Sequence, residues 1–380
     1  MSSQIRLRLL PRARCLFDEP VQVKVARLRS RQVVTMKAKS TDERGMVFSS
    51  SATYRADDRG EVDLDRQPSL GGSYVGVEPM GLLWSLRTEA SHQYFEKGKS
   101  LMPHVVTISV HDEDGTVLAE ANNERFLLGD GVTRLPVNEG NLRGVLFTPS
   151  GPGPFPAVLD LNTFASERRA ALLANKGFVV LALYVFSDNP KNVKGILLDH
   201  YTDRIDFLQR QPKVNGQGVG VLSRSKAADI ALSLSAFAPA VKACVWINGC
   251  SGNLVTPLYY KNNQILSAIR IDHSRGIQTE SGAFILKFAI TNPLAEENKG
   301  SLIPVEQAKA QLLFVASEDD MCLNSKAYVD QMVERLKRHG KNNFERIYYP
   351  KAGHMLEPPY GPFCRSCYLG IYLYQALWGG

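Results

Sequence analysis

The 380-residue sequence contains no apolar run of the about 18 residues that a transmembrane helix needs, so we expect no membrane span. It also lacks blocks of like charge. Its 45 lysines and arginines are interspersed with 38 aspartates and glutamates, and this mixing at a net charge of +7 argues against a nucleic-acid partner. The basic N-terminus, MSSQIRLRLLPRARCLFDEP, lacks the continuous apolar stretch of a secretory signal, and the C-terminal LWGG is not a peroxisomal address. We therefore expect a cytoplasmic protein.

The sequence lacks the dense, regular cysteine spacing of a disulfide framework. The six cysteines are scattered, which is typical of free thiols in a reducing compartment, and they are Cys15, Cys244, Cys250, Cys322, Cys364 and Cys367. The last two form a single C-x-x-C pair with no second pair to match it, so we predict no zinc site. The sequence predicts no other metal and no separate cofactor, and it carries no signal for an oligomeric state.

The two halves of the sequence differ in hydrophobic period. Before about residue 137, runs such as 22–28 and 105–112 alternate with period two between turn-rich pieces, which predicts the short strands of a β-sandwich. Later, apolar runs alternate with amphipathic helices, one of them ending at Gly177, and this predicts a parallel sheet covered on both faces. We therefore predict an immunoglobulin-like β-sandwich over 1–137 and an α/β domain over 138–380.

One strand-to-helix junction lacks the glycines that usually frame a nucleophilic serine. In VGVLSRSKAADIALSLSAF, residues 219–237, a strand, the turn SRSKA and a helix follow one another. If the turn is a nucleophile elbow, Ser225 occupies the apex, and Ser223 and Ala227 replace the flanking glycines. A serine at such a junction also serves as a helix N-cap, and that alternative stays open.

An acid and a histidine follow in the order that an α/β-hydrolase requires. The apolar run QLLFVAS leads directly into Asp319 and Asp320, and His354 lies in the loop YPKAGHMLEPPY. In the predicted roles His354 removes the proton of Ser225 as it attacks a thioester carbonyl, and Asp320 orients the imidazole. The backbone N–H of Lys226 and a donor from the loop after AVLDL, assigned to Asn162, bind the oxyanion.

At these residues the chain resembles the family of acyl-CoA thioesterases and bile acid-CoA:amino acid N-acyltransferases. The most specific pieces are PFPAVLDL, GVGVLSRSK, WINGC, HGKNN and AGHMLEPPYGPFCR, and the likeness runs over nearly the whole chain. The resemblance implies an N-terminal β-sandwich, an α/β-hydrolase domain and an acyl-enzyme mechanism with CoA as the leaving group. It places the triad on Ser225, Asp320 and His354.

The resemblance leaves three functions to weigh. Serine at the apex favours hydrolysis of fatty acyl-CoA, whereas the bile acid conjugating branch, which transfers to taurine or glycine, has cysteine there. The third function is that of an inactive member that only binds acyl-CoA. Three departures favour it: the loop NTFASERRA is short and has no glycine, Ala227 replaces a glycine, and the family's last helix and its frequent peroxisomal signal do not follow Gly380. We expect a serine acyl-CoA thioesterase, with acyl-CoA as its substrate partner.

Overall fold

The chain forms two compact units. The computed structural model describes residues 4–95, 101–140, 142–186, 193–369 and 374–379. The first unit comprises Met1–Gly129 and Glu357–Cys364, and the second comprises Asp130–Leu356 and Arg365–Gly380.

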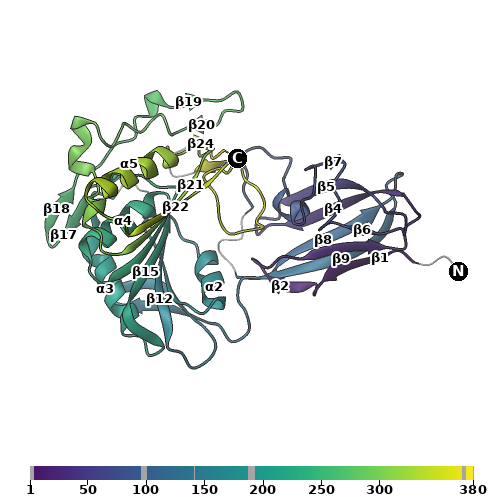
Figure 1. The fold of residues 1–380 in the computed structure, drawn as a ribbon, viewed down its shortest axis with the longest axis horizontal. Helices are drawn as coiled ribbons and strands as arrows, with labels where there is room; N and C mark the ends of the chain where they lie inside the picture. Colours follow the sequence, from purple (N-terminus) through teal and green to yellow (C-terminus); the bar gives the residue numbers. More distant parts are fainter. Residues whose placement is uncertain (1–3, 96–100, 141, 187–192, 370–373, 380) are drawn as a thin grey trace. The chain divides into compact units, whose positions relative to one another are not determined.

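The first unit is a β-sandwich. One sheet has the strand order β2-β9-β8-β4-β5-β7 and the other β1-β3-β6 (Figure 1). The elements are β1 (Arg6–Leu10), β2 (Arg14–Leu16), β3 (Gln22–Ala26), β4 (Val33–Thr41), β5 (Val47–Arg55), β6 (Val62–Asp63), β7 (Gly71–Gly72), α1 (Gly81–Trp84), β8 (His104–His111) and β9 (Val117–Phe126). Both sheets contribute to one core, in which Val25 of β3 joins Met36 of β4 and Ile108 of β8. The strands predicted at 22–28 and 105–112 are β3 and β8, which confirms both.

The domain limits differ from the predicted 1–137 and 138–380. Strand β10 (Thr133–Glu139) pairs with β11 (Leu142–Thr148) of the second unit, so the sandwich ends earlier, at Gly129. The chain also returns to the first unit at Glu357–Cys364, three residues after His354. Within that segment the backbone N–H of Phe363 donates to Trp84 O at 2.8 Å. A break in the hydrophobic period locates the end of a strand, but it does not tell which sheet a strand joins.

The second unit is built on an eight-stranded sheet of order β10-β11-β13-β12-β15-β16-β21-β22. Its remaining strands are β12 (Phe155–Asn162), β13 (Val179–Tyr184), β15 (Val214–Arg224), β16 (Val241–Ile247), β21 (Gln311–Ser317) and β22 (Phe344–Tyr349). From β13 to β22 all neighbouring strands are parallel. Strands β12 and β13 are buried along most of their length because helices cover both faces, as the uninterrupted apolar runs predicted.

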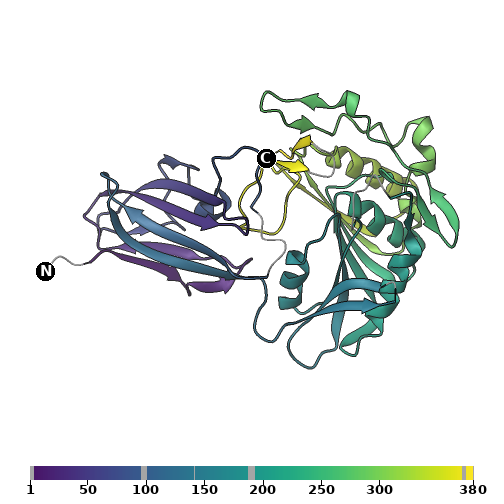
Figure 2. The ribbon, with the colours of Figure 1, turned by 180° about the vertical axis from the view of Figure 1, so that it is seen from behind.

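Four helices of at least two turns pack on this sheet in the described part of the second unit. They are α2 (Arg168–Asn175), α3 (Leu198–Gln209), α4 (Lys226–Phe237) and α5 (Ser325–Arg338). Helix α2 lies on one face, and α3, α4 and α5 lie on the other (Figure 1 and Figure 2). As predicted, α2 stops before Gly177, whose φ of +91° is a left-handed conformation that glycine adopts at little cost.

Shorter elements complete the second unit. They are the sheet β14 (Ile196–Leu197), β17 (Leu258–Tyr260) and β18 (Asn263–Leu266), the sheet β19 (Ile277–Gln278), β20 (Phe284–Ile285), β24 (Tyr374–Leu377) and β23 (Ser366–Leu369), and the 3-10 turns His273–Arg275, Glu296–Ser301 and Val305–Gln307. Over the described residues, no helix is both long enough and apolar enough to cross a membrane. The fold is therefore an α/β-hydrolase domain preceded by a β-sandwich, and the loops at the carboxyl ends of β12, β15, β16 and β21 share one edge of the sheet.

Candidate active site

Ser225 is the single residue between the end of β15 and the start of α4. Its φ of 61° and ψ of −136° lie in a region that residues other than glycine rarely adopt, which costs about 1–3 kcal/mol. Its backbone is held on both sides: the N–H donates to Ile247 O at 3.0 Å, and the carbonyl accepts from Ala228 N–H at 2.9 Å. The Ser225 hydroxyl makes no capping bond to α4, every residue of which is described, so the N-cap interpretation is not supported.

Ser223 lies inside the sheet. Its side chain is fully buried, and its hydroxyl donates to Val245 O of the neighbouring strand β16 at 3.0 Å. Ser225, by contrast, is only partly buried. Of the two serines, only Ser225 occupies the apex of the turn, and Ser223 is a framing residue whose hydroxyl is used for strand pairing.

Asp320 and His354 are brought together from the ends of β21 and β22. The Nδ1 atom of His354 and Oδ2 of Asp320 are 2.9 Å apart, and both side chains are almost fully buried. Asp320 has three further donors: the N–H groups of Cys322 and Leu323 at 2.8 and 3.1 Å, and the Ser325 hydroxyl at 2.7 Å. These bonds hold the carboxylate with one oxygen facing the imidazole. Asp319, the neighbouring candidate, is only partly buried.

The same loop offers a possible metal donor set. Ligand atoms of Asp320, Cys322 and His354 lie within 4.8 Å of one another. Burial, reinforced by the Asp320 charge, raises the pKa of the Cys322 thiol well above its ordinary value, so it stays protonated and is a poor ligand. The direct contact of Asp320 with His354 suits proton transfer better than metal binding. The absence of a metal stays a prediction.

The loop after β12 is held by a buried ion pair. Arg169, in the first turn of α2, donates through Nε to Asp160 Oδ1 at 2.5 Å and through Nη2 to Leu161 O at 2.8 Å. Asn162 donates through Nδ2 to Asp160 Oδ2 at 3.1 Å and to Ser166 O at 3.4 Å. The side chain of Asn162 therefore binds within its own loop, and the assignment of this residue as an oxyanion donor stays a prediction that these contacts do not favour.

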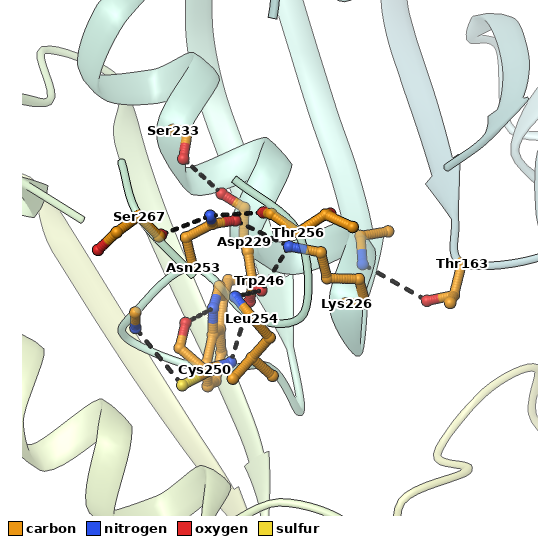
Figure 3. Close-up of polar contacts among 12 residues, drawn as sticks. Thr163, Lys226, Asp229, Ser233, Trp246, Cys250, Asn253, Leu254, Thr256 and Ser267 are labelled. Atoms are coloured by element: carbon orange, nitrogen blue, oxygen red, sulfur yellow. Dashed lines mark hydrogen bonds and ion pairs between the residues drawn. The ribbon is translucent and has the colours of Figure 1, made fainter. Parts of the chain in front are cut away.

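Thr163, the next residue, contacts the elbow directly and was missed by the sequence reasoning. Its Oγ1 donates to Arg224 O at 3.3 Å and accepts from the N–H of Ala227 at 3.4 Å. The bonds thus reach the residue before Ser225 and the second residue of α4. Figure 3 shows the Thr163 hydroxyl pointing toward the start of this helix. The only feature of the sequence that could have pointed to Thr163 is its hydroxyl, which comes directly after strand β12. The methyl group of Ala227 is accommodated, since this residue is fully buried within the regular helix.

Beneath the elbow, the side chain of Lys226 enters a buried polar network (Figure 3). Its Nζ lies 3.2 Å from Asp229 Oδ2 and 2.8 Å from Asn253 Oδ1. Asp229 also accepts from the N–H of Leu254 at 3.0 Å and of Cys250 at 3.4 Å. Burial lowers the pKa of Lys226 and raises that of Asp229 to about 6, and the attraction between the two side chains opposes both shifts. The network fixes the first turn of α4, which directly follows Ser225.

Known proteins match the chain over nearly its full length. Human acyl-coenzyme A thioesterase 2, mitochondrial, is 39% identical over 98% of this chain and 79% of its own length. The chain belongs to the acyl-CoA thioester hydrolase/BAAT family. Residues 18–139 match the family's "Acyl-CoA thioester hydrolase/BAAT N-terminal region", and residues 196–380 match its "BAAT / Acyl-CoA thioester hydrolase C terminal".

Two more relatives and one solved structure complete the comparison. Human acyl-coenzyme A thioesterase 1 is 39% identical over 98% of this chain and 90% of its own length. Mouse acyl-coenzyme A thioesterase 6 is 41% identical over 93% and 85%. Among solved structures, the Pyrococcus horikoshii acylaminoacyl peptidase is similar with a TM-score of 0.42 at 14% identity, over 89% of this chain and 55% of that chain. Membership of the family rests on the sequence relatives.

Proposed function

We propose that this protein is a serine acyl-CoA thioesterase that hydrolyses fatty acyl-CoA to a free fatty acid and CoA. The observation that carries the proposal is the strained, partly exposed Ser225 at an elbow whose sheet edge also presents the paired Asp320 and His354. The names of the relatives point to the same substrate class.

The contact between His354 and Asp320 supports a proton path through the imidazole. With Nδ1–H donating to the carboxylate, the neutral ring keeps its lone pair on Nε2, the nitrogen that a general base needs. His354 takes the Ser225 proton as Oγ bonds to the thioester carbonyl carbon, and the CoA sulfur leaves with that proton. A water molecule, activated by the same imidazole, then cleaves the acyl-serine ester and restores the Ser225 hydroxyl.

The oxyanion of each tetrahedral intermediate needs two donors. The backbone N–H of Lys226 is the first N–H of α4 and has no acceptor within the helix. For the second donor we propose the backbone N–H of Thr163, because this residue lies in the loop after β12 and its hydroxyl, which already donates to Arg224 O, ties that loop to both sides of the elbow. Loss of one such donor typically lowers kcat by about 10²–10³-fold.

Transfer to taurine or glycine is the alternative activity. The structure offers an oxygen nucleophile, and an acyl-serine ester reacts with amines more slowly than an acyl-cysteine thioester does. Water therefore has the advantage as the second substrate, and this preference is part of the proposal.

The test measures CoA release from fatty acyl-CoA and bile acyl-CoA thioesters, with and without taurine or glycine, for the wild type, Ser225→Ala and Ser223→Ala. We expect release that is unchanged by the amines, is abolished in Ser225→Ala and is only weakened in Ser223→Ala. The Ser223→Ala variant is the matched control, since it removes a hydroxyl two residues away. An amide as the main product would establish the transferase, and a folded wild type that releases no CoA would contradict both activities.

A further inference from the structure

Asn248 follows β16, the strand between the one that carries the nucleophile and the one that leads to the acid. The residue before it, Ile247, accepts a hydrogen bond from the N–H of Ser225 at 3.0 Å, and the N–H of Asn248 itself donates to Val315 O of β21 at 3.0 Å. The backbone at this point therefore connects the elbow to the acid strand.

The Asn248 side chain is fully buried, and both its oxygen and its nitrogen are hydrogen-bonded. Its Oδ1 accepts from the N–H of Ser317 at 2.8 Å. Its Nδ2 donates to Ser317 Oγ at 2.9 Å and His354 O at 3.0 Å, with Gly353 O at 3.4 Å. One amide thus joins the last residue of β21 to the peptide of the proposed base.

The backbone of His354 is consequently held at both of its polar groups. Its carbonyl accepts from Asn248, and its N–H donates to Trp378 O at 2.8 Å. The Trp378 carbonyl also accepts from the N–H of Met321 next to Asp320, at 3.4 Å. Because a buried peptide group without a partner costs about 1–3 kcal/mol, these bonds resist rotation of the loop that carries the imidazole.

We propose that Asn248 is a positioning residue that locks the His354 loop to the end of β21, and so keeps the imidazole within reach of Ser225. The inference rests on the proposed function for the role of His354. Asn248 touches neither substrate nor reacting atoms, and it acts only through the two loops that it joins.

Only an asparagine-like amide fits this site. Turned by half a rotation, the amide would set NH₂ against the Ser317 N–H and its oxygen against two carbonyls, so the hydrogen-bond pattern allows one orientation. The backbone φ of 44° is left-handed, a region that asparagine enters more readily than most residues. An aspartate would keep the acceptor but would place a carboxylate oxygen against the carbonyls of Gly353 and His354.

The test compares the wild type with Asn248→Ala by two independent assays. The first measures kcat and KM for CoA release from a fatty acyl-CoA. The second measures the rate at which a fluorophosphonate probe phosphonylates Ser225, where Oγ bonds to phosphorus, fluoride leaves and His354 takes the proton. We expect both kcat and the phosphonylation rate to fall by about 10²-fold, with KM changed less than about threefold, because the base is displaced while the binding surface is kept.

Asn343→Ala is the matched control. Asn343, directly before β22, also donates its amide to two carbonyls, Ala308 O at 3.1 Å and Ala310 O at 2.6 Å, at the opposite end of the strands. It should lower the unfolding temperature as Asn248→Ala does, but leave phosphonylation and kcat near the wild-type values. Equal rates in Asn248→Ala and the wild type would overturn the positioning role.

A second variant keeps the test decisive if Asn248→Ala does not fold. In Asn248→Asp the activity relative to wild type should rise as the pH falls, since the protonated carboxyl group donates again. A ratio of Asn248→Asp to wild-type activity that does not change with pH would overturn the proposal.

The two assays also distinguish a failure of the proposed thioesterase function from a failure of the positioning role. Phosphonylation without CoA release would contradict the thioesterase but leave the Asn248 comparison valid, whereas a wild type that is not phosphonylated at Ser225 would overturn the positioning role.

Discussion

Replacing Lys226 by methionine is expected to destabilise the second unit strongly, because it removes the cation that pairs with the fully buried carboxylate of Asp229. Lys226 and Asp229 are 3.2 Å apart, and their side chains are 6% and 0% exposed. Methionine fills a similar volume, so the substitution changes charge far more than packing. What it leaves behind is a carboxylate that keeps two backbone N–H donors but has lost its ion-pair partner.

The magnitude follows from the cost of breaking a buried ion pair on one side, about 3–5 kcal/mol. In Lys226→Met/Asp229→Asn both charges are gone, and the new amide oxygen still accepts from the N–H of Leu254 or Cys250. The double variant should therefore lose only about 2 kcal/mol, the cost of one weakened hydrogen bond at position 229 and of the lost bond from Lys226 Nζ to Asn253 Oδ1. Each single variant is expected to be less stable than the double variant.

Urea unfolding measures the difference in stability between the single and double variants, provided that the fluorescence signal comes from the second unit alone. Of the three tryptophans, Trp84 lies in the first unit, whereas Trp246 and Trp378 lie in the second. In a Trp84→Phe background, tryptophan fluorescence therefore follows the second unit alone. The free energy of unfolding would be compared for the four members of the cycle at pH 7.5 and pH 5.

The stability difference between Lys226→Met and the wild type should also depend on pH, in a direction that the pKa of Asp229 predicts. Burial raises the pKa of Asp229 from 3.8 to about 6, so its stabilising contribution is complete below its unfolded pKa and is lost as the pH rises through about 6. Without Lys226 the pKa rises further, and Lys226→Met should regain stability relative to wild type between pH 7.5 and pH 5. A loss below about 1 kcal/mol at both pH values, or a double variant equal to the sum of the singles, would refute this reasoning.

Three further variants test the site. Asp320→Asn should lower kcat by about 10⁴-fold, because the imidazole loses the acceptor that fixes its tautomer. The acylation rate measured by stopped flow should fall by the same factor, and an acylation rate equal to that of the wild type would contradict this role. Gly353→Ala should lower kcat by at least about tenfold, since an added Cβ would lie 2.3 Å from Gly379 O and must displace the His354 loop, whereas unchanged kinetics would show that the loop yields freely. Thr163→Val keeps the side-chain shape and removes the hydroxyl that binds the elbow. We expect kcat to fall about tenfold and the free energy of unfolding to fall by about 1 kcal/mol. An unaltered kcat would show that this hydroxyl does not contribute to catalysis.

Local sequence patterns predicted most of the architecture. Continuous apolar runs identified buried parallel strands, and the chain order of Ser225, Asp320 and His354 placed each candidate at a strand end. The reason is physical: side-chain period and turn residues act over a few positions, so they are legible without knowledge of the fold. The predicted domain limit at residue 137 differed from the observed one because of β10, whose alternating pattern fits a strand of either unit.

The motif WINGC shows what a pattern can and cannot tell. As a string it indicated the family, but not what its residues do. In the structure Trp246 is fully buried edge-on to Phe314, and Gly249 leaves no room for a Cβ, which would lie 2.6 Å from Ala228 Cβ of α4. Asn248 binds the two loops of the proposed acid and base.

By itself the sequence determined the elements, their order and three of the residues at the proposed site. Only the tertiary structure decided that Ser223 faces β16, that the Asn162 amide turns into its own loop, and that Lys226 is buried against Asp229. It also brought Asn248 to Gly353 and His354, more than a hundred positions along the chain. These outcomes depend on which strands become neighbours, and strand order is set by packing the whole sheet rather than by any short stretch of residues.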